Sequence, residues 1–145
     1  MGTGNAILSN SIFDNGSLGI NLNPGGVTAN DVQDPDGGAN NLQNFPVLLS
    51  ALSNGSVTTV AGALNSTPAT TFTLQFFASL SCDPSGNGEG KRLLGSTTVT
   101  TNRGGNIRFF VTVRPAQRGE FVTATATDPN NNTSEFSACR AVTAF

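Results

Sequence analysis

Residues 120–139, EFVTATATDPNNNTSEFSAC, constrain the fold of this chain more than any other stretch. Apolar Val122, Ala124 and Ala126 alternate with threonines. A period of two is typical of a strand with one buried face and one exposed face. The turn residues at 128–132, DPNNN, end this strand, and a second strand follows up to a cysteine. The stretch therefore predicts a half-buried strand joined to a second strand by a tight polar turn.

Strand-like segments recur at short, regular spacing through the rest of the chain, which is typical of an all-β domain. Phe72, Leu74 and Phe76 share one face of such a segment, and Ile107 and Phe109 share a face of another. Because each segment has an apolar face, the fold predicted is an antiparallel β-sandwich of about seven strands in two packed sheets. The predicted strands cover residues 47–52, 56–65, 70–80, 92–101, 105–114, 120–127 and 136–143.

The composition supports an all-β fold and excludes some classes of function. The 145 residues include 17 Asn, 18 Thr and 17 Gly, and threonine favours strands while asparagine and glycine favour turns. Only 11% of residues are charged and the net charge is −2, which excludes the basic surface of a nucleic-acid-binding protein. No apolar run approaches the roughly 18 residues of a transmembrane helix, so we expect no membrane insertion.

The chain contains two cysteines, Cys82 and Cys139. In a chain of low charge that is rich in Asn, Thr and Gly, they indicate one disulfide of an exported protein. Such a bond would stabilise the fold by about 4 kcal/mol in the chain-entropy model. Two free buried thiols in a cytosolic protein are the alternative. We therefore expect an extracellular protein, either secreted or on a cell surface.

The N-terminal part, residues 1–23, has a different pattern. Short apolar pairs, such as Ile7-Leu8 and Ile12-Phe13, are separated by Ser, Asn, Asp and Gly. This pattern resembles one coil of a right-handed parallel β-helix. One coil cannot bury its apolar face without stacked neighbours, so a longer parent protein is implied. A hairpin packed against the following domain is the alternative.

The chain is thus divided into a terminal β-helix coil at 1–23, an Asp/Asn/Gly-rich linker at 24–44 and a sandwich at 45–145. Residues 30–48, NDVQDPDGGANNLQNFPVL, and residues 72–101, FTLQFFASLSCDPSGNGEGKRLLGSTTVTT, carry a resemblance to a known family, as does the stretch 119–139. They resemble the bacterial Ig-like module that follows β-helix repeats in large secreted or surface proteins. The resemblance covers nearly the whole chain and implies that the two cysteines pair. The core Trp and corner Tyr of Ig domains are missing, so it implies an Ig-like architecture only.

Four residues of the linker are candidate Ca²⁺ ligands: Asn30, Asp31, Asp34 and Asp36. Ca²⁺ takes about six to eight oxygen ligands in flexible geometry, and closely spaced side-chain oxygens in a Gly-containing loop can supply them. The spacing is not that of an EF-hand. A solvated linker in which these residues only make turns is the alternative.

Catalytic chemistry has little support, and we predict no catalytic residue. Because His is absent, a His-activated nucleophile and a zinc centre with imidazole ligands cannot be built. Asp83 and Glu89 could form a glycosidase pair, but we interpret them as parts of a solvated Gly-rich loop. Asp128 and Glu135 flank the Asn-rich turn and are interpreted in the same way, with Asp128 accepting hydrogen bonds within the turn.

The sequence therefore predicts a non-catalytic structural or adhesive module that caps a β-helix in a larger protein. Ile7, Ile12 and Leu18 are expected to pack on the first strands of the sandwich, and the uncovered coil could lead to self-association. The alternative is an accessory, carbohydrate-binding domain of a polysaccharide-degrading β-helix enzyme. A surface glycan or a protein is then the partner, and Phe77 and Phe110, on the polar-facing register of their strands, offer a small platform.

Overall fold

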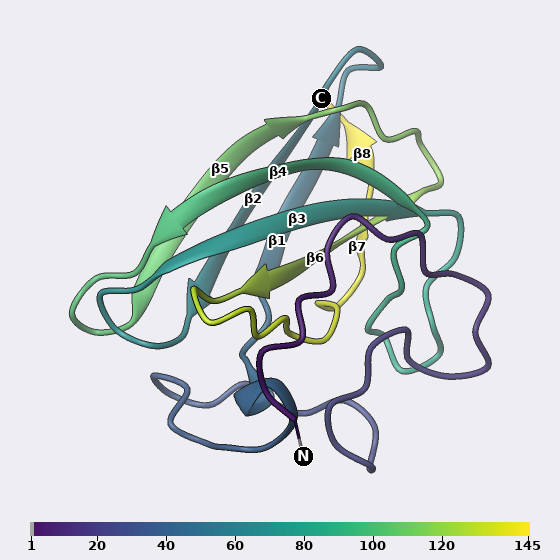
Figure 1. Ribbon diagram of the computed structural model, residues 1–145. Helices are drawn as coiled ribbons and strands as arrows, with labels where there is room; N and C mark the ends of the chain where they lie inside the picture. The colour runs from purple at the N-terminus through teal and green to yellow at the C-terminus, as the bar shows by residue number, and fades with distance from the viewer. Residues whose placement is uncertain (1) are drawn as a thin grey trace.

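The computed structural model describes residues 2–145, and these fold into two four-stranded sheets packed face to face (Figure 1). The strand orders are β5-β2-β1-β8 and β4-β3-β6-β7. Neighbouring strands pair antiparallel, except β1 and β8, which are parallel. The elements are a 3-10 turn η1 (Ala39–Leu42) and strands β1 (Val47–Ser53), β2 (Thr58–Asn65), β3 (Thr71–Ser79), β4 (Arg92–Thr100), β5 (Asn106–Val113), β6 (Phe121–Thr127), β7 (Arg140–Ala141) and β8 (Thr143–Ala144). The predicted all-β sandwich is confirmed.

The main core lies between the two sheets and uses the strand faces that the alternation predicts. Phe72, Leu74 and Phe76 of β3 are fully buried there, opposite the small side chains of β6. Phe109 of β5 meets Phe76 edge to face, with ring centroids 5.7 Å apart. Ala124, also fully buried, belongs to the same cluster. The aromatic rings thus fill the space that small residues of β6 leave open.

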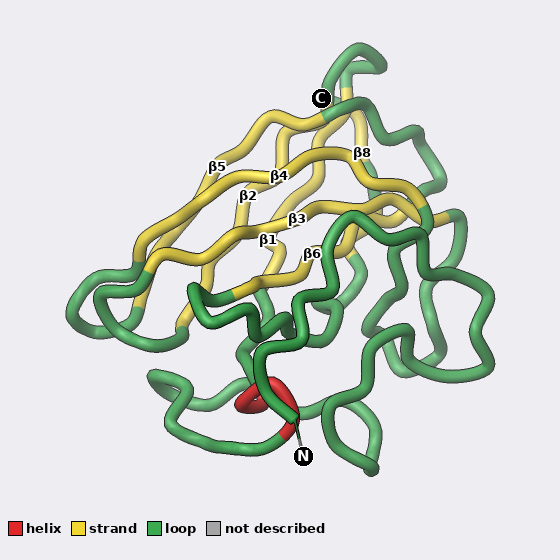
Figure 2. The backbone as a smooth tube through the Cα atoms, in the orientation of Figure 1, coloured by secondary structure: helices red, strands yellow, loops and turns green. Residues whose placement is uncertain are grey.

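Strand β6 differs from the half-buried strand that its alternation predicts, because both of its faces are buried. Thr123 and Thr125, on the polar face, are each only 1% exposed. Loops cover this outer face of the second sheet, and the N-terminal segment passes in front of β3 and β6 (Figures 1 and 2). The hydroxyl of Thr123 donates to the carbonyl of Glu89, 2.8 Å away. A third layer therefore replaces water on this face.

The prediction of a last strand at residues 136–143 is wrong over most of that range. Irregular chain follows β6, and only the two-residue strands β7 and β8 remain. The backbone amides of Ala124 and Ala126 donate to the hydroxyls of Ser137 and Ser134, at 2.9 and 3.0 Å. Side-chain hydroxyls here take the place of backbone carbonyls, so a regular ladder does not form.

Residues 5–23 do not show a β-helix coil. Within the described part of the chain, the segment makes one isolated bridge, between Ile12 and Gly90, and otherwise runs as irregular chain across the second sheet. Met1, which the predicted coil also includes, lies outside the described residues. The division into three parts stays a prediction.

The apolar side chains of this segment form a second cluster outside the sandwich core. Ile20 is buried there with Phe77 of β3 and Phe136, and Ile7 and Ile12 pack against them. The rings of Phe77 and Phe136 meet edge to face, with centroids 5.5 Å apart. The predicted packing on the first strands is therefore wrong, because the segment covers β3. Phe77 is buried and offers no platform for a ligand.

Cys82 and Cys139 form a disulfide, with Cα atoms 6.1 Å apart. It connects the loop between β3 and β4 to the irregular chain before β7. The predicted pairing is confirmed, and it indicates an oxidising environment such as the extracellular space. Within residues 2–145, no helix is long and apolar enough to cross a membrane.

Candidate metal site

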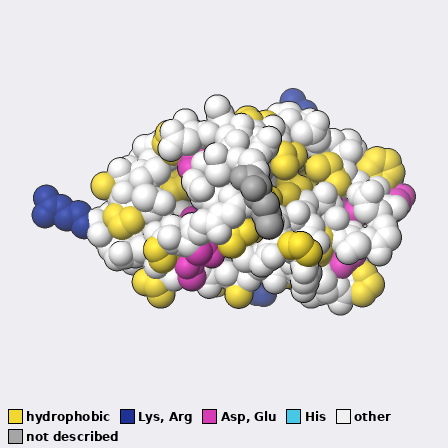
Figure 3. All heavy atoms as spheres, turned by 60° about the horizontal axis from the view of Figure 1, so that its bottom comes forward, with side chains coloured by type: hydrophobic (Ala, Val, Ile, Leu, Met, Phe, Trp, Pro, Cys, Tyr) yellow, Lys and Arg dark blue, Asp and Glu magenta, His cyan; other side chains and the backbone are white. Residues whose placement is uncertain are grey.

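Three carboxylates of the predicted linker lie together at one end of the molecule. Asp31, Asp34 and Asp36 each offer one oxygen, and these oxygens all lie within 4.8 Å of one another. The chain between residues 24 and 44 is at the bottom of Figure 1, and the C-terminus is at the top. In Figure 3, which turns the bottom of that view forward, acidic side chains gather in a small patch on a mostly uncharged surface.

One oxygen of each carboxylate is buried and has no hydrogen-bond partner among the described residues. These oxygens are Asp31 Oδ1, Asp34 Oδ1 and Asp36 Oδ1. Buried polar atoms without partners are rare in folded proteins, because the lost hydration is not replaced. Three neighbouring acidic groups, each with such an oxygen, form a candidate site for a cation.

The other oxygen of Asp34 is held by three donors. Oδ2 accepts from Gln43 Nε2 at 2.8 Å, from the amide of Asn44 at 3.0 Å and from the hydroxyl of Ser66. Ser66 directly follows β2, so these contacts join the linker to the end of the first sheet. The side chain of Asp34 therefore has a fixed orientation, and its other oxygen, Oδ1, is buried without a partner among the described residues.

The electrostatics of the cluster disfavour three negative charges without a counter-ion. Burial raises the pKa of Asp34 to about 6, although hydrogen bonds from Ser66 and Asn44 act in the opposite direction. The charges of Asp36 and Asp31 raise this pKa further. Burial and the charge of Asp31 also raise the pKa of Asp36. A divalent cation would reverse these effects, since it favours the ionised carboxylates.

The structure places the fourth predicted ligand, Asn30, in a different role. Its Nδ2 donates to the carbonyl of Phe45 at 2.8 Å, and its Oδ1 accepts from the Phe45 amide at 2.9 Å. Asn44 makes a similar pair with the backbone of Asp31, at 3.1 and 2.7 Å. These two asparagines close the loop that carries the carboxylates. Asn30 thus positions the site, while the three aspartates face one another.

The donor set suits a hard cation with oxygen ligands. Separations within 4.8 Å are compatible with Ca²⁺–oxygen distances of about 2.3–2.6 Å around one central ion. The three carboxylates supply part of the shell of about six to eight oxygens, and water completes such shells in many proteins. Zn²⁺ prefers nitrogen and sulfur ligands, which this cluster lacks.

The other acidic residues considered from the sequence have separate roles. Hydrogen bonds from Ser85 lower the pKa of Asp83, a surface group. Glu89 accepts from the amide of Asn15 at 3.2 and 3.3 Å. Asp128 accepts from backbone amides of the Asn-rich turn, which confirms its predicted role.

Glu135 differs from the solvated residue that the sequence suggests, since it is only 2% exposed. Its Oε1 accepts from the amide of Leu22, and its Oε2 accepts from the amide of Thr28, both at 2.9 Å. These donors lie more than 100 positions earlier in the chain, so no local pattern reveals them.

A groove at the opposite end of the sandwich is a second feature that the sequence does not reveal. Its volume is about 1070 Å³. The ends of β1 and β3, the start of β4, the loop between β5 and β6, and residues 144–145 line it. The large apolar side chains of Leu80 and Phe145 are exposed beside it.

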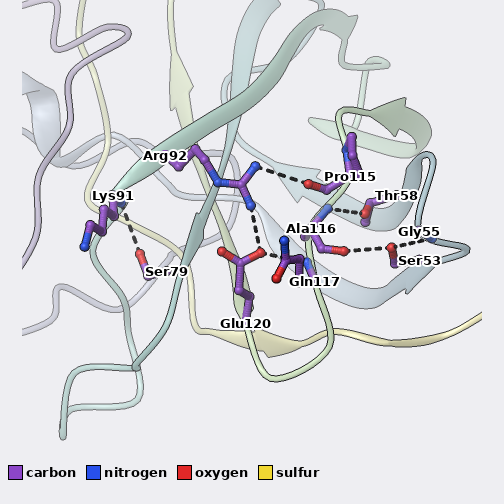
Figure 4. Close-up of polar contacts among 10 residues, drawn as sticks. All are labelled: Ser53, Gly55, Thr58, Ser79, Lys91, Arg92, Pro115, Ala116, Gln117 and Glu120. Atoms are coloured by element: carbon purple, nitrogen blue, oxygen red, sulfur yellow. Dashed lines mark hydrogen bonds and ion pairs between the residues drawn. The ribbon is translucent and has the colours of Figure 1, made fainter.

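The contacts within this groove hold the loop between β5 and β6 in place (Figure 4). Arg92 forms an ion pair with Glu120 at 2.7 Å and donates to the carbonyl of Pro115 at 3.1 Å. The hydroxyl of Ser53 donates to the carbonyl of Ala116 at 2.7 Å. The paired charges and the short hydrogen bonds support the shape of the groove.

A scan against protein-family models finds no match, and a search of curated proteins finds no similar sequence. Of the features described, the carboxylate cluster has the most specific chemistry, because its donor atoms, charge and burial all favour one class of ligand.

Proposed function

We propose that this protein is a non-catalytic structural module of an extracellular protein and that it binds one Ca²⁺ at Asp31, Asp34 and Asp36. The proposal is supported by three carboxylates that each offer one oxygen within 4.8 Å of the others, and that each have one buried oxygen without a hydrogen-bond partner among the described residues. A bound cation gives each of them a partner and offsets their repulsion. The cluster joins the linker to β2, so the ion has a structural role.

Isothermal titration of the metal-free protein with Ca²⁺ tests the proposal. We expect one site, with a dissociation constant of about 10⁻⁴–10⁻³ M, as in other extracellular calcium modules. Mg²⁺ should bind more weakly, because it demands a smaller octahedral shell. D34N should abolish binding, whereas D14N, which removes an equal charge from an exposed residue outside the cluster, should not. Absence of a binding signal for the wild type at millimolar Ca²⁺ would sink the idea.

The disulfide supports the extracellular location of this module, since such bonds persist in oxidising compartments. The two-sheet architecture supports the Ig-like resemblance, and the resemblance in turn supports a place after a parallel β-helix in a bacterial secreted or cell-surface protein. In such a protein the N-terminal segment connects the upstream chain to the sandwich. A rigid connection of this kind suits a spacer or an adhesive unit.

A second candidate function is ligand binding by the outer face of the first sheet. Phe110 of β5 is 74% exposed there, and small Ala61 lies directly opposite it on β2. Because the alanine side chain is small, it leaves the face of the exposed phenylalanine ring accessible. Such a ring can stack on a sugar, as expected of an accessory carbohydrate-binding domain. A glycan array with the wild type and F110A tests this function. Equal signals from both proteins would exclude Phe110 from binding.

A further inference from the structure

The turn η1 lies between the carboxylate cluster and the start of the chain, and its backbone is unusual. Asn40, Asn41 and Leu42 have φ values of 46°, 53° and 50°, in the left-handed region. Residues other than glycine rarely adopt this region, and three in succession are held only when surrounding contacts impose them. The turn therefore depends on its neighbours for its shape.

Contacts with the N-terminal segment hold one side of this turn. Asn40 Oδ1 accepts from the amide and from the side chain of Asn5, both at 3.0 Å. Asn40 Nδ2 donates to the carbonyls of Asn5 and Thr133, at 2.8 and 3.1 Å. The amide of Asn40 also donates to the carbonyl of Gly2 at 3.0 Å. Asn40 therefore makes most of the contacts that fix the first described residues to the sandwich, and Asn132 Oδ1 adds one by accepting from the amide of Gly4 at 2.7 Å.

The carboxylate cluster holds the other side of the turn. The amide of Gln43 donates to the carbonyl of Asn40 at 3.1 Å, and its side chain donates to Asp34 Oδ2. The next residue, Asn44, also donates its amide to Asp34 Oδ2. A continuous series of hydrogen bonds therefore leads from Asp34, through Gln43 and Asn40, to Asn5.

We propose that Ca²⁺ binding to Asp31, Asp34 and Asp36 fastens the first residues of the N-terminal segment to the sandwich through the turn η1. The proposal rests on the calcium site proposed above and adds its regulation. Without the cation, the three carboxylates repel one another, and the loop that carries them relieves this repulsion by opening. Opening withdraws Asp34 from Gln43, and the left-handed turn loses the support that holds Asn40. The cation shifts the equilibrium toward the closed arrangement, because it binds that arrangement better.

The effect should be confined to the part of the segment that depends on η1. From Ile7 onward, the segment is held by contacts with groups outside η1. The amide of Ile12 donates to the carbonyl of Gly90 at 2.8 Å, and the amide of Leu22 donates to Glu135. Ile20 is buried in the outer apolar cluster. Residues 2–5 are therefore the part that is fastened to the sandwich when Ca²⁺ is bound and that moves more freely when Ca²⁺ is absent.

We call this Ca²⁺-dependent attachment of the first residues through η1 the lock. Amide hydrogen exchange of the whole chain, with and without saturating Ca²⁺, tests it. We expect exchange at Asn5, Asn40 and Gln43 to slow by about tenfold or more, since ligand in excess suppresses the open form by mass action. The amides of Ile12 and Gly90 should exchange at unchanged rates and serve as internal controls. Q43M removes the link to Asp34 but keeps all three carboxylates. This variant should bind Ca²⁺ in a titration while its Asn5 amide no longer responds.

The outcomes separate the two proposals. If the wild type binds Ca²⁺ but exchange at Asn5 and Asn40 does not change, the lock is overturned and the calcium site stands. If the titration gives no binding, both proposals fail. A uniform slowing that includes Ile12 and Gly90 would also overturn the lock, because it would indicate global stabilisation. The comparison of the wild type with and without Ca²⁺ decides the question even where Q43M does not fold.

Discussion

At the scale of single residues, the two oxygens of Asp34 have opposite environments. Three donors surround Oδ2, whereas Oδ1 is buried and has no partner in the described chain. The donors favour the ionised form, but burial has the larger effect and raises the pKa to about 6. We therefore expect the charge of Asp34 to destabilise the metal-free protein at neutral pH.

Replacement of Asp34 by Asn should have opposite effects in the absence and presence of calcium. In metal-free buffer at pH 7, D34N should be more stable than the wild type by about 1 kcal/mol, after allowance for solvent screening of a partly exposed group. The Asn oxygen keeps the acceptor position of Oδ2, and its amide donates toward Asp31 and Asp36. Urea unfolding measures the difference, and added Ca²⁺ should stabilise only the wild type.

The sign of the pH dependence follows from the raised pKa of Asp34. The folded protein holds a proton on this residue up to about pH 6, whereas the unfolded chain releases it near pH 3.8. The contribution of Asp34 to stability is thus fully present below about pH 3.8 and is lost as the pH rises through about 6. The advantage of D34N should narrow below pH 6 and vanish near pH 4. A constant difference across this range would contradict the assignment, and D14N should follow the wild type.

At the scale of elements, the N-terminal segment is held by side chains of the sandwich instead of by a neighbouring strand. The amide of Ile7 donates to Thr133 Oγ1 at 2.9 Å, and that of Ser9 donates to Gln75 Oε1 at 2.7 Å. The amide of Leu22 donates to Glu135 Oε1. Because side-chain acceptors are irregularly spaced, the segment satisfies its buried amides without forming a strand.

Glu135 is the most sensitive of these acceptors, because it accepts two backbone hydrogen bonds in a buried position. E135Q should destabilise the protein by about 2 kcal/mol, since the new amide nitrogen must face either the Leu22 or the Thr28 amide, donor against donor. Urea unfolding measures the loss, and amide exchange at Leu22 and Thr28 should accelerate. E89Q is the matched control, because Glu89 accepts a longer, exposed hydrogen bond. Equal stabilities of E135Q and E89Q would contradict this role.

At the scale of the whole molecule, the fold has two apolar clusters in three layers. The main cluster lies between the sheets, and the outer cluster lies between β3 and the N-terminal segment. The disulfide joins two parts of the outer layer, the loop after β3 and the chain before β7. The cross-link therefore secures the third layer, which has no regular strands of its own to hold it.

Those parts of the fold and of the site that can be predicted from the sequence depend on residues close together in the chain. Alternation alone assigns Phe72 and Phe109 to the core face, because a strand presents every second residue to the same side. The three aspartates are detectable because they fall within six positions of one another. Glu135 and the groove beside Ala116 are not detectable in this way, because each is completed by residues far apart in the sequence.

The all-β class, the inward faces of β3, β5 and β6, and the presence of an acidic loop can be predicted from the amino-acid sequence, because they follow from short-range spacing. Three other features depend on long-range contacts: the threonine face of β6 is covered, Phe77 is buried, and Asn30 positions the loop while the aspartates lie close together. A polar strand face has the same sequence pattern whether it meets water or a polar, hydrogen-bonding layer of protein. Which of the two it meets depends on where distant segments of the chain return.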